Sequence, residues 1–111
     1  MANVAKVLGQ LLQLSGSSAG DLYTVPASTQ TVVSTLTVAN LTAGAGTFDV
    51  AVRVSGSAIE NKHYIYKSVD LPANDTFAAT FGITLAATAI ISVASTVSAS
   101  FNLFGQELTT A

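Results

Sequence analysis

His63 is the only histidine among the 111 residues, and the chain has no cysteine. A catalytic triad or a histidine-based metal site would therefore have to be assembled around this one side chain, without thiol nucleophiles or cysteine ligands. Glu60, Lys62 and Tyr64 lie near it without forming a catalytic motif, and no two carboxylates stand at the spacing of metal ligands. We interpret His63 as a surface or interface residue and expect a protein that is not an enzyme, with no metal and no cofactor.

A second group of polar side chains lies on predicted strands. Asp49 and Arg53 share the outward face of one strand, but four residues separate them, which is too far for a direct ion pair. They form either surface pairs with adjacent strands, worth about 0–1 kcal/mol, or an intersubunit salt bridge that fixes register. Tyr64 and Tyr66 are predicted to share one strand face, where they either stack on a glycan or a partner protein or pack inside the sandwich.

Charge is scarce in this chain. Charged residues make up 9% of the sequence, against roughly 25% in an average soluble domain, and 50% of the residues are hydrophobic. Four scattered cations cannot form the basic stripe that nucleic-acid binding requires. Ser, Thr and Gly interrupt every apolar run before the ~18–20 residues of a membrane helix, so we expect neither nucleic acid nor membrane as a partner. The composition favours an obligate oligomer or an assembly component whose surface is covered by neighbouring subunits.

From Val32 onward, apolar and polar residues alternate with a period of two, which is the pattern of strands with one buried face. Turn sequences rich in Gly, Pro, Asn and Asp separate these segments. We predict an all-β fold, a single β-sandwich of jelly-roll type with about 6–8 strands. Lys67 falls on the apolar face of its strand, which indicates either a bulge or a lysine stem lying on apolar surface. The expected core residues are Phe48, Val50, Val52, Val54, Phe77, Phe81, Ile83, Phe101 and Leu103.

Residues 1–20 are predicted to form an N-terminal arm and linker, separate from a β-sandwich domain at residues 21–111. Apolar residues recur in the arm at helical spacing, but Gly9 costs about 1 kcal/mol inside a helix, so helix, strand and disorder stay open. The segment from Ser15 to Gly20 is typical of a flexible linker. We expect the arm to pack on a neighbouring subunit or as an edge strand of its own oligomer. With the outward threonines of the first long strand, the candidate interface residues are Val7, Leu8, Leu11, Leu12, Thr31, Thr35 and Thr37.

Several segments, taken in order, resemble a family of small all-β structural proteins of tailed-phage virions. The resemblance covers nearly all of the chain, and Ala89 departs from it at a position where family members often carry an acidic residue. The matching segments are Leu22-Tyr23-Thr24-Val25-Pro26-Ala27, Thr37-Val38-Ala39-Asn40, Thr47-Phe48-Asp49-Val50-Ala51-Val52, Asn61-Lys62-His63-Tyr64-Ile65-Tyr66, Leu71-Pro72-Ala73-Asn74-Asp75-Thr76-Phe77, Gly82-Ile83-Thr84-Leu85 and Phe101-Asn102-Leu103-Phe104-Gly105-Gln106-Glu107.

The resemblance implies a virion component without enzymatic activity, assembled in the cytoplasm of a bacterial host. The form we expect is a capsid decoration, or cement, protein that binds over the junctions between major capsid protein subunits. A homo-oligomer is expected, and a trimer is favoured because the local three-fold positions of a capsid lattice select that symmetry. Two alternatives stay open: a tail, neck, baseplate or fibre component, and a module that binds host glycans.

Overall fold

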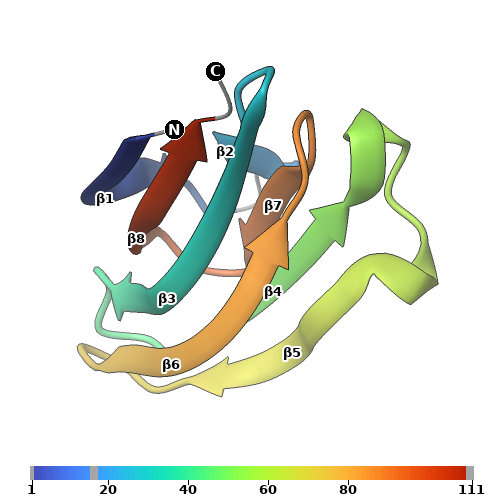
Figure 1. Cartoon of the computed structure of the whole chain (residues 1–111). Helices are drawn as coiled ribbons and strands as arrows, with labels where there is room; N and C mark the ends of the chain where they lie inside the picture. Colours follow the sequence, from blue (N-terminus) through green and yellow to red (C-terminus); the bar gives the residue numbers. More distant parts are fainter. Residues whose placement is uncertain (1, 16–17, 110–111) are drawn as a thin grey trace.

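The protein is an eight-stranded β-sandwich in the computed structural model (Figure 1). The structure describes the backbone of residues 2–15 and 18–109, and their side chains apart from those of residues 2, 3, 56, 61 and 81. Two short 3-10 turns lie in the connection between the fourth and fifth strands, η1 (Val54–Gly56) and η2 (Asn61–His63). The strands are β1 (Ala2–Gln13), β2 (Gly20–Thr24), β3 (Thr29–Asn40), β4 (Gly46–Arg53), β5 (Tyr64–Leu71), β6 (Thr76–Leu85), β7 (Ile90–Ser95) and β8 (Ala99–Thr109).

The strands form two antiparallel sheets of four strands each. Sheet A has the order β1-β8-β3-β6, and sheet B has the order β2-β7-β4-β5. The chain crosses repeatedly between the sheets, and β4 and β5 are the only consecutive strands that pair within the described ladders. An eight-stranded double sheet with this interleaved order is a jelly roll. The predicted all-β sandwich of jelly-roll type is therefore confirmed.

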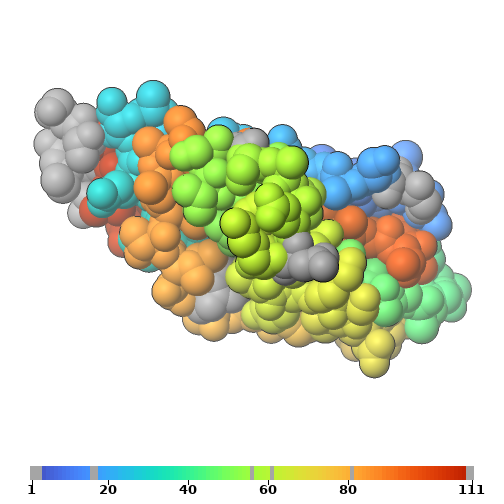
Figure 2. Space-filling view, turned by 90° about the vertical axis from the view of Figure 1, so that its right-hand side faces the viewer, coloured from blue at the N-terminus to red at the C-terminus, as the bar shows by residue number. Residues whose placement is uncertain are grey.

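The molecule is elongated, with principal extents of 47 × 27 × 19 Å. Strand β1 lies at the left of Figure 1, whereas β5 and the connection from β4 to β5 lie at the bottom and right. Figure 2 views the molecule from that right-hand side, where the segment between β4 and β5 covers the middle of the surface. The two ends of the sandwich therefore carry different elements: a terminal strand on one side and the longest connection on the other.

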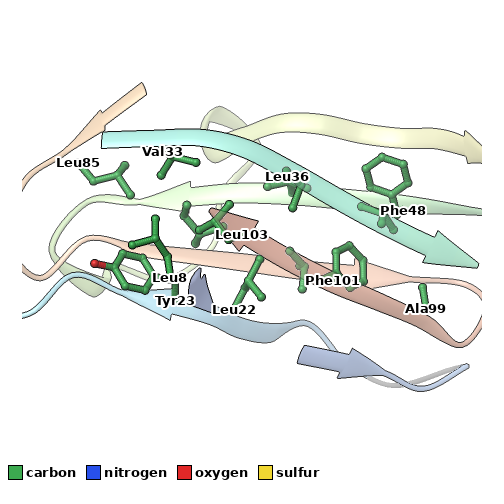
Figure 3. Packing of buried hydrophobic residues seen from close by; sticks show 14 of the residues in the cluster. Leu8, Leu22, Tyr23, Val33, Leu36, Phe48, Leu85, Ala99, Phe101 and Leu103 are labelled. Carbon is green, nitrogen blue, oxygen red and sulfur yellow. The ribbon is translucent and has the colours of Figure 1, made fainter. Parts of the chain in front are cut away.

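The core lies between the sheets and is built by alternate residues of the strands (Figure 3). Phe48 and Phe101 pack with ring centroids 6.3 Å apart, and Phe77 approaches Phe48 at 5.0 Å. Of the expected core residues, four are fully buried and three are partly buried against the core. The buried four are Phe48, Val50, Phe101 and Leu103, and the partly buried three are Val52, Phe77 and Ile83.

Two expected core residues need separate comment. Val54 was expected in the core, and this prediction is wrong: its side chain is 66% exposed. The reason is that β4 ends at Arg53, and the chain enters the η1 turn, where period-two alternation no longer applies. The side chain of Phe81 lies outside the described residues.

A row of β-bulges crosses sheet A. The register between β1 and β8 shifts from Val7 to Gly9, opposite Phe104 and Leu103. The register of β3 shifts from Val33 to Thr35 against both β8 and β6, at the same level of β8. Bulges of this kind bend a sheet and change which residues face inward.

Gly105 lies in this row because the strands approach too closely for a side chain. A Cβ atom at this position would lie 2.1 Å from the carbonyl oxygen of Val32 and 3.0 Å from Leu8. A Cβ at Gly9 would similarly lie 2.2 Å from the carbonyl oxygen of Leu22, in the opposite sheet. Both glycines are thus required by close backbone approach.

The N-terminal segment differs from the expected separate arm. Residues 2–13 form β1, which pairs with β8 along its whole length. Leu8 belongs to the core and Leu11 packs against it. Ser15 continues the attachment, because its backbone N–H donates to Ser98 Oγ at 3.2 Å and its hydroxyl to the Thr96 carbonyl at 3.1 Å. The bulge explains the helix-like spacing of the leucines, since one extra residue converts a period of two into a step of three.

We expect Phe101→Ala to lower the free energy of unfolding by about 3–5 kcal/mol, because it removes a fully buried aromatic side chain and leaves a cavity. Val54→Ala is the matched control, and its effect should stay near zero since Val54 is 66% exposed. Equilibrium unfolding in urea measures both variants. Equal effects of the two substitutions would contradict the assigned core.

A second pair of variants tests the close approach in the bulge row. Gly105→Ala should destabilise the protein, because its Cβ would overlap the Val32 carbonyl oxygen. Gly44→Ala should be neutral or slightly stabilising, since no atom lies within 4 Å of a Cβ there and alanine restricts the unfolded chain. The difference in thermal midpoint between the two variants is the measurement. A Gly105→Ala protein as stable as Gly44→Ala would refute the crowding at this position.

Candidate interaction surface

The charged side chains are distributed unequally between the two sheets. Among the described strands, those of sheet A carry only Lys6 and Glu107, and these two pair with each other at 3.0 Å. The strands of sheet B carry Asp21, Asp49, Arg53, Lys67 and Asp70. The remaining charged residues lie in the connections. Charge is thus concentrated on one side of the sandwich.

The outward-facing residues of sheet A form a surface without charge, which we name the outer face of sheet A. Its members are identified by register, because directly paired residues of antiparallel strands face the same side. Strands β3 and β6 contribute only Thr, Ala and Val, β1 adds a glutamine and a leucine, and β8 contributes one aromatic ring. The members are Ala5, Val7, Gln10 and Leu12 of β1, Ser100, Asn102, Phe104 and Gln106 of β8, Val32, Thr35, Thr37 and Ala39 of β3, and Thr76, Ala78, Thr80 and Thr84 of β6.

A hollow of about 280 Å³ lies on this face, where the bulge row crosses β1, β8 and β3. Its lining is small and uncharged: Ala5, Val32, Ser34, Gly105 and Gln106. Gly105 carries no side chain, and Ser34 stands in the register shift of β3 between Val33 and Thr35. The hollow can accept an apolar or amide side chain of a partner protein, and its lining offers no group for acid–base catalysis.

Beneath the same end of sheet A, four polar side chains form a cluster that joins the two sheets. We call Lys6, Tyr23, Thr31 and Glu107 the Glu107 cluster. The Tyr23 hydroxyl donates to Glu107 Oε2 at 2.5 Å and lies 2.7 Å from Thr31 Oγ1. Lys6 Nζ lies 3.0 Å from Glu107 Oε1. Every member belongs to a different strand, so the cluster ties β1, β2, β3 and β8 together.

The cluster perturbs the protonation of two of its members. Burial raises the pKa of the Tyr23 phenol from 10.0 to about 12, and the hydrogen bond to Glu107 acts in the same direction. The same hydrogen bond holds the pKa of Glu107 below its ordinary 4.5, with a further contribution from Lys6. Glu107 is therefore a carboxylate at neutral pH, and the Tyr23 hydroxyl and the Lys6 ammonium satisfy it. This arrangement is that of a structural polar network.

The predicted outward pair of β4 finds its partners within the chain. Arg53 donates to Ser92 Oγ at 3.1 Å, on the adjacent strand β7, and to Asp21 Oδ1 at 2.8 Å, on β2 one strand further. Asp49 accepts from Lys67 Nζ at 3.3 Å and from the Ser68 backbone N–H at 2.7 Å. Of the two alternatives, the intrachain pairing is the one that the structure shows, and no intersubunit bridge is needed to satisfy either residue.

The seven candidate interface residues of the N-terminal half divide into two groups. Val7 and Leu12 are 47% and 55% exposed, and Thr35 and Thr37 lie on the outer face of sheet A. The other three face the interior: Leu8 and Thr31 are buried, and Leu11 is partly buried against the core. Thr31 is fully buried because it belongs to the Glu107 cluster.

The prediction that Tyr64 and Tyr66 share one face of β5 is wrong. Tyr66 packs against the core, 5.6 Å from Phe77, whereas Tyr64 lies under the ammonium of Lys67 at 4.5 Å. The register of β5 against β4 shifts between Val50 and Ala51. Because of this one extra residue in β5, the two tyrosines face opposite sides of the sheet. A further shift between Phe48 and Val50 confirms the bulge that was predicted near Lys67.

His63 has a local role in the η2 turn. Its Nδ1 accepts a hydrogen bond from the Glu60 backbone N–H at 2.9 Å, and this contact caps the turn. Among the described residues, no group of three or more His, Cys, Asp and Glu side chains could hold a metal ion. None of the described segments is a helix long and apolar enough to cross a membrane.

Sequence reasoning missed the uncharged face, although the sequence contained a signal for it. No charged residue occurs from residue 22 to residue 48 or from residue 76 to residue 106. These two stretches contain all of β3 and β6 and most of β8. The Glu107 cluster left no such signal, because its four members come from distant parts of the chain.

The stability of the protein should fall between about pH 10 and pH 12. An exposed Tyr23 in the unfolded chain loses its proton near pH 10.0, whereas the folded state holds that proton to about pH 12. Unfolding then releases a proton, so alkali favours the unfolded state, by about 1–3 kcal/mol over this range. Equilibrium unfolding at a series of pH values measures the slope. Tyr23→Phe should flatten it and Tyr64→Phe should leave it unchanged; identical slopes in all three proteins would contradict the assignment.

No known protein family matches the chain, and no curated protein matches it either. Among solved structures, chains in the structures of infectious bursal disease virus, strains Gt and Gx, are similar in fold, with a TM-score of 0.48 for each. Their sequences are 9% and 10% identical to this one over 95% and 96% of its length. This chain spans 31% and 32% of those chains.

Proposed function

We propose that the protein is a non-enzymatic structural subunit of a virion and that it docks through the outer face of sheet A. The observation that carries this proposal is the absence of charge from the described strands of that face, while sheet B carries five charged residues. The cores of protein interfaces are depleted of charged residues in the same way. A protein that is only 9% charged and nevertheless keeps those charges off one face has a surface suited to burial against a partner.

The chemistry of the face explains why burial there is favourable. Burying a charged side chain costs free energy unless it is paired, and no such cost arises on this face. Its threonine and serine hydroxyls can exchange water for a partner's hydrogen-bonding groups. Val7, Leu12, Val32 and Phe104 add apolar area, which contributes roughly 25 cal/mol per Å² when it leaves water. The hollow beside Gly105 offers a position for one inserted side chain.

The specific form we propose is a decoration protein on a tailed-phage capsid, which binds the major capsid protein as a homo-oligomer. The sequence resemblance to phage structural proteins supports it, and the jelly roll supports it by analogy, since viral capsid domains often have this architecture. We expect a trimer if the subunit occupies the local three-fold positions of the capsid lattice, because those positions select that symmetry. A tail, neck, baseplate or fibre component is the alternative, and the number of copies per particle separates the two.

A glycan-binding module is not favoured. That hypothesis uses Tyr64, Tyr66 and the loop from Ser55 to Lys62 for glycan contact, with the two rings on one face. Tyr66 packs against the core instead, and Tyr64 is covered by Lys67. A sugar-stacking platform of two adjacent tyrosines is therefore missing from the described part of β5.

The test is incorporation of variants into particles. Thr37→Lys places a cation in the middle of the outer face of sheet A, and we expect its copy number per particle to fall at least tenfold, about 1.4 kcal/mol of lost binding. Ala58→Lys places the same charge on the exposed connection between β4 and β5 and should incorporate normally. Quantitative mass spectrometry of purified particles gives both numbers, and circular dichroism checks that each variant folds.

The wild-type copy number identifies the location on the particle. A number close to that of the major capsid protein supports decoration, and a number typical of one ring or fibre supports the tail, neck or baseplate. Complete absence of the protein from purified particles would overturn the virion role. Equal incorporation of Thr37→Lys and Ala58→Lys would overturn the docking face while leaving that role intact.

A further inference from the structure

Strand β1 is an open edge of sheet A. Within the described residues it forms a ladder with β8 alone, so the N–H and C=O groups on its other side lack strand partners. It has 12 residues, which makes it one of the two longest strands of the protein. Figure 1 shows it as the outermost strand of the sheet. A long open edge is a template for pairing with another chain.

The other sheet edges are protected or less apolar. Strand β2 has only five residues, and β5 carries Lys67, Asp70 and two register shifts. Strand β6 is uncharged, but its described outward side chains are small, Thr and Ala. Short length, charge and bulges are the usual means by which proteins prevent edge pairing. Strand β1 has one bulge, no proline and one cation.

That cation does not guard the edge. Its ammonium pairs with Glu107 at 3.0 Å, although 44% of the Lys6 side chain is exposed, and Glu107 is held by Tyr23 on the opposite sheet. Apart from Lys6 and Gln10, the exposed side chains between residues 4 and 14 are apolar. Seven large hydrophobic side chains are exposed in the described part of the protein, and four of them are Val4, Val7, Leu12 and Leu14, with exposures of 48%, 47%, 55% and 56%.

The bulge makes β1 complementary to itself. Leu8 and Gly9 both face inward, because Leu8 is in the core and the Cβ direction of Gly9 points at the Leu22 carbonyl oxygen. On either side of them the facing alternates: Val7 faces outward before the bulge and Gln10 faces outward after it. Two antiparallel copies of β1 can match inward to inward and outward to outward along the whole strand only when the two-fold axis passes between Leu8 and Gly9.

We propose that β1 pairs with β1 of a second copy of this chain around that two-fold axis, which extends sheet A across the dimer. In this register Val7 lies opposite Gln10 of the second copy, and Ala5 lies opposite Leu12. No like charges meet, because Lys6 lies opposite Leu11. The same surface patch serves both copies, as an isologous contact requires. A two-fold pair is thus an alternative to the trimer, and it does not depend on the virion role.

Disulfide trapping tests the register, and the absence of native cysteine gives a clean background. The double variant Val7→Cys, Gln10→Cys should form a covalent dimer under mild oxidation, since directly opposed strand residues have Cβ atoms about 4.5–5.5 Å apart. The matched control is Val7→Cys, Leu12→Cys, whose positions face the same side but are displaced by two residues. We expect at least a tenfold lower yield from the control on non-reducing gels.

A second experiment tests the contact without cysteine. Val7→Lys, Leu12→Lys places two cations on the edge, and sedimentation or light scattering at micromolar concentration should show a shift from dimer to monomer. The matched control Ala78→Lys, Thr80→Lys on β6 should stay dimeric. Circular dichroism and the thermal midpoint confirm that both proteins fold.

The possible failures are distinct. A wild-type monomer at these concentrations, equal trapping of the two cysteine pairs, or a lysine variant that stays dimeric would each overturn the β1 contact. A stable trimer without trapping between positions 7 and 10 would overturn it in favour of the three-fold arrangement. None of these outcomes bears on the copy number in particles, which tests the virion role.

Discussion

The close approach of strands at the bulge row of sheet A is the constraint on which the other features depend. Gly105 has no room for a Cβ, since that atom would lie 2.1 Å from the Val32 carbonyl oxygen, and this proximity is possible only with glycine. The register shifts at this level turn Leu8 inward, which attaches β1 to the core. The hollow on the outer face lies at the same level, and the shift in β1 sets the facing of the residues on either side of it. Core, surface and edge are therefore linked at one line across the sheet.

The Glu107 cluster shows how the protein keeps its few charges away from this sheet's surface. Glu107 is largely buried, and a carboxylate that leaves water costs free energy unless it is paired and hydrogen-bonded. Here the Tyr23 hydroxyl and the Lys6 ammonium satisfy Glu107, and Thr31 in turn contacts the Tyr23 hydroxyl. As a consequence, the one cation of β1 is paired with Glu107 on the side of the strand opposite to the outer face, where the strand presents valine and leucine.

The sequence predicted the class of the fold but not the points where the alternation breaks. Phe48, Val50, Phe101 and Leu103 were identified because uninterrupted period-two segments place them on one face. Leu8, Tyr64 and Val54 were misplaced because a bulge or a strand end shifts the facing by one residue, and a single extra residue leaves no mark in a local pattern. The hydrogen-bonding partners of Arg53 and Glu107 could not be predicted from the sequence either, since the strand order brings together residues that are far apart in the chain.

The edge and the outer face of sheet A have a common geometric consequence. A two-fold axis through paired β1 strands stands perpendicular to the sheet, so the outer faces of both copies lie on the same side. The dimer would then present two four-stranded sheets as one continuous, uncharged surface, with the charges of sheet B on the opposite side. Pairing at the edge therefore leaves the outer face free and doubles its extent. A dimer of this kind would bind a partner assembly with twice the contact area of one chain. A trimer whose subunits contact each other through the outer faces of sheet A would bury those faces and lose this advantage.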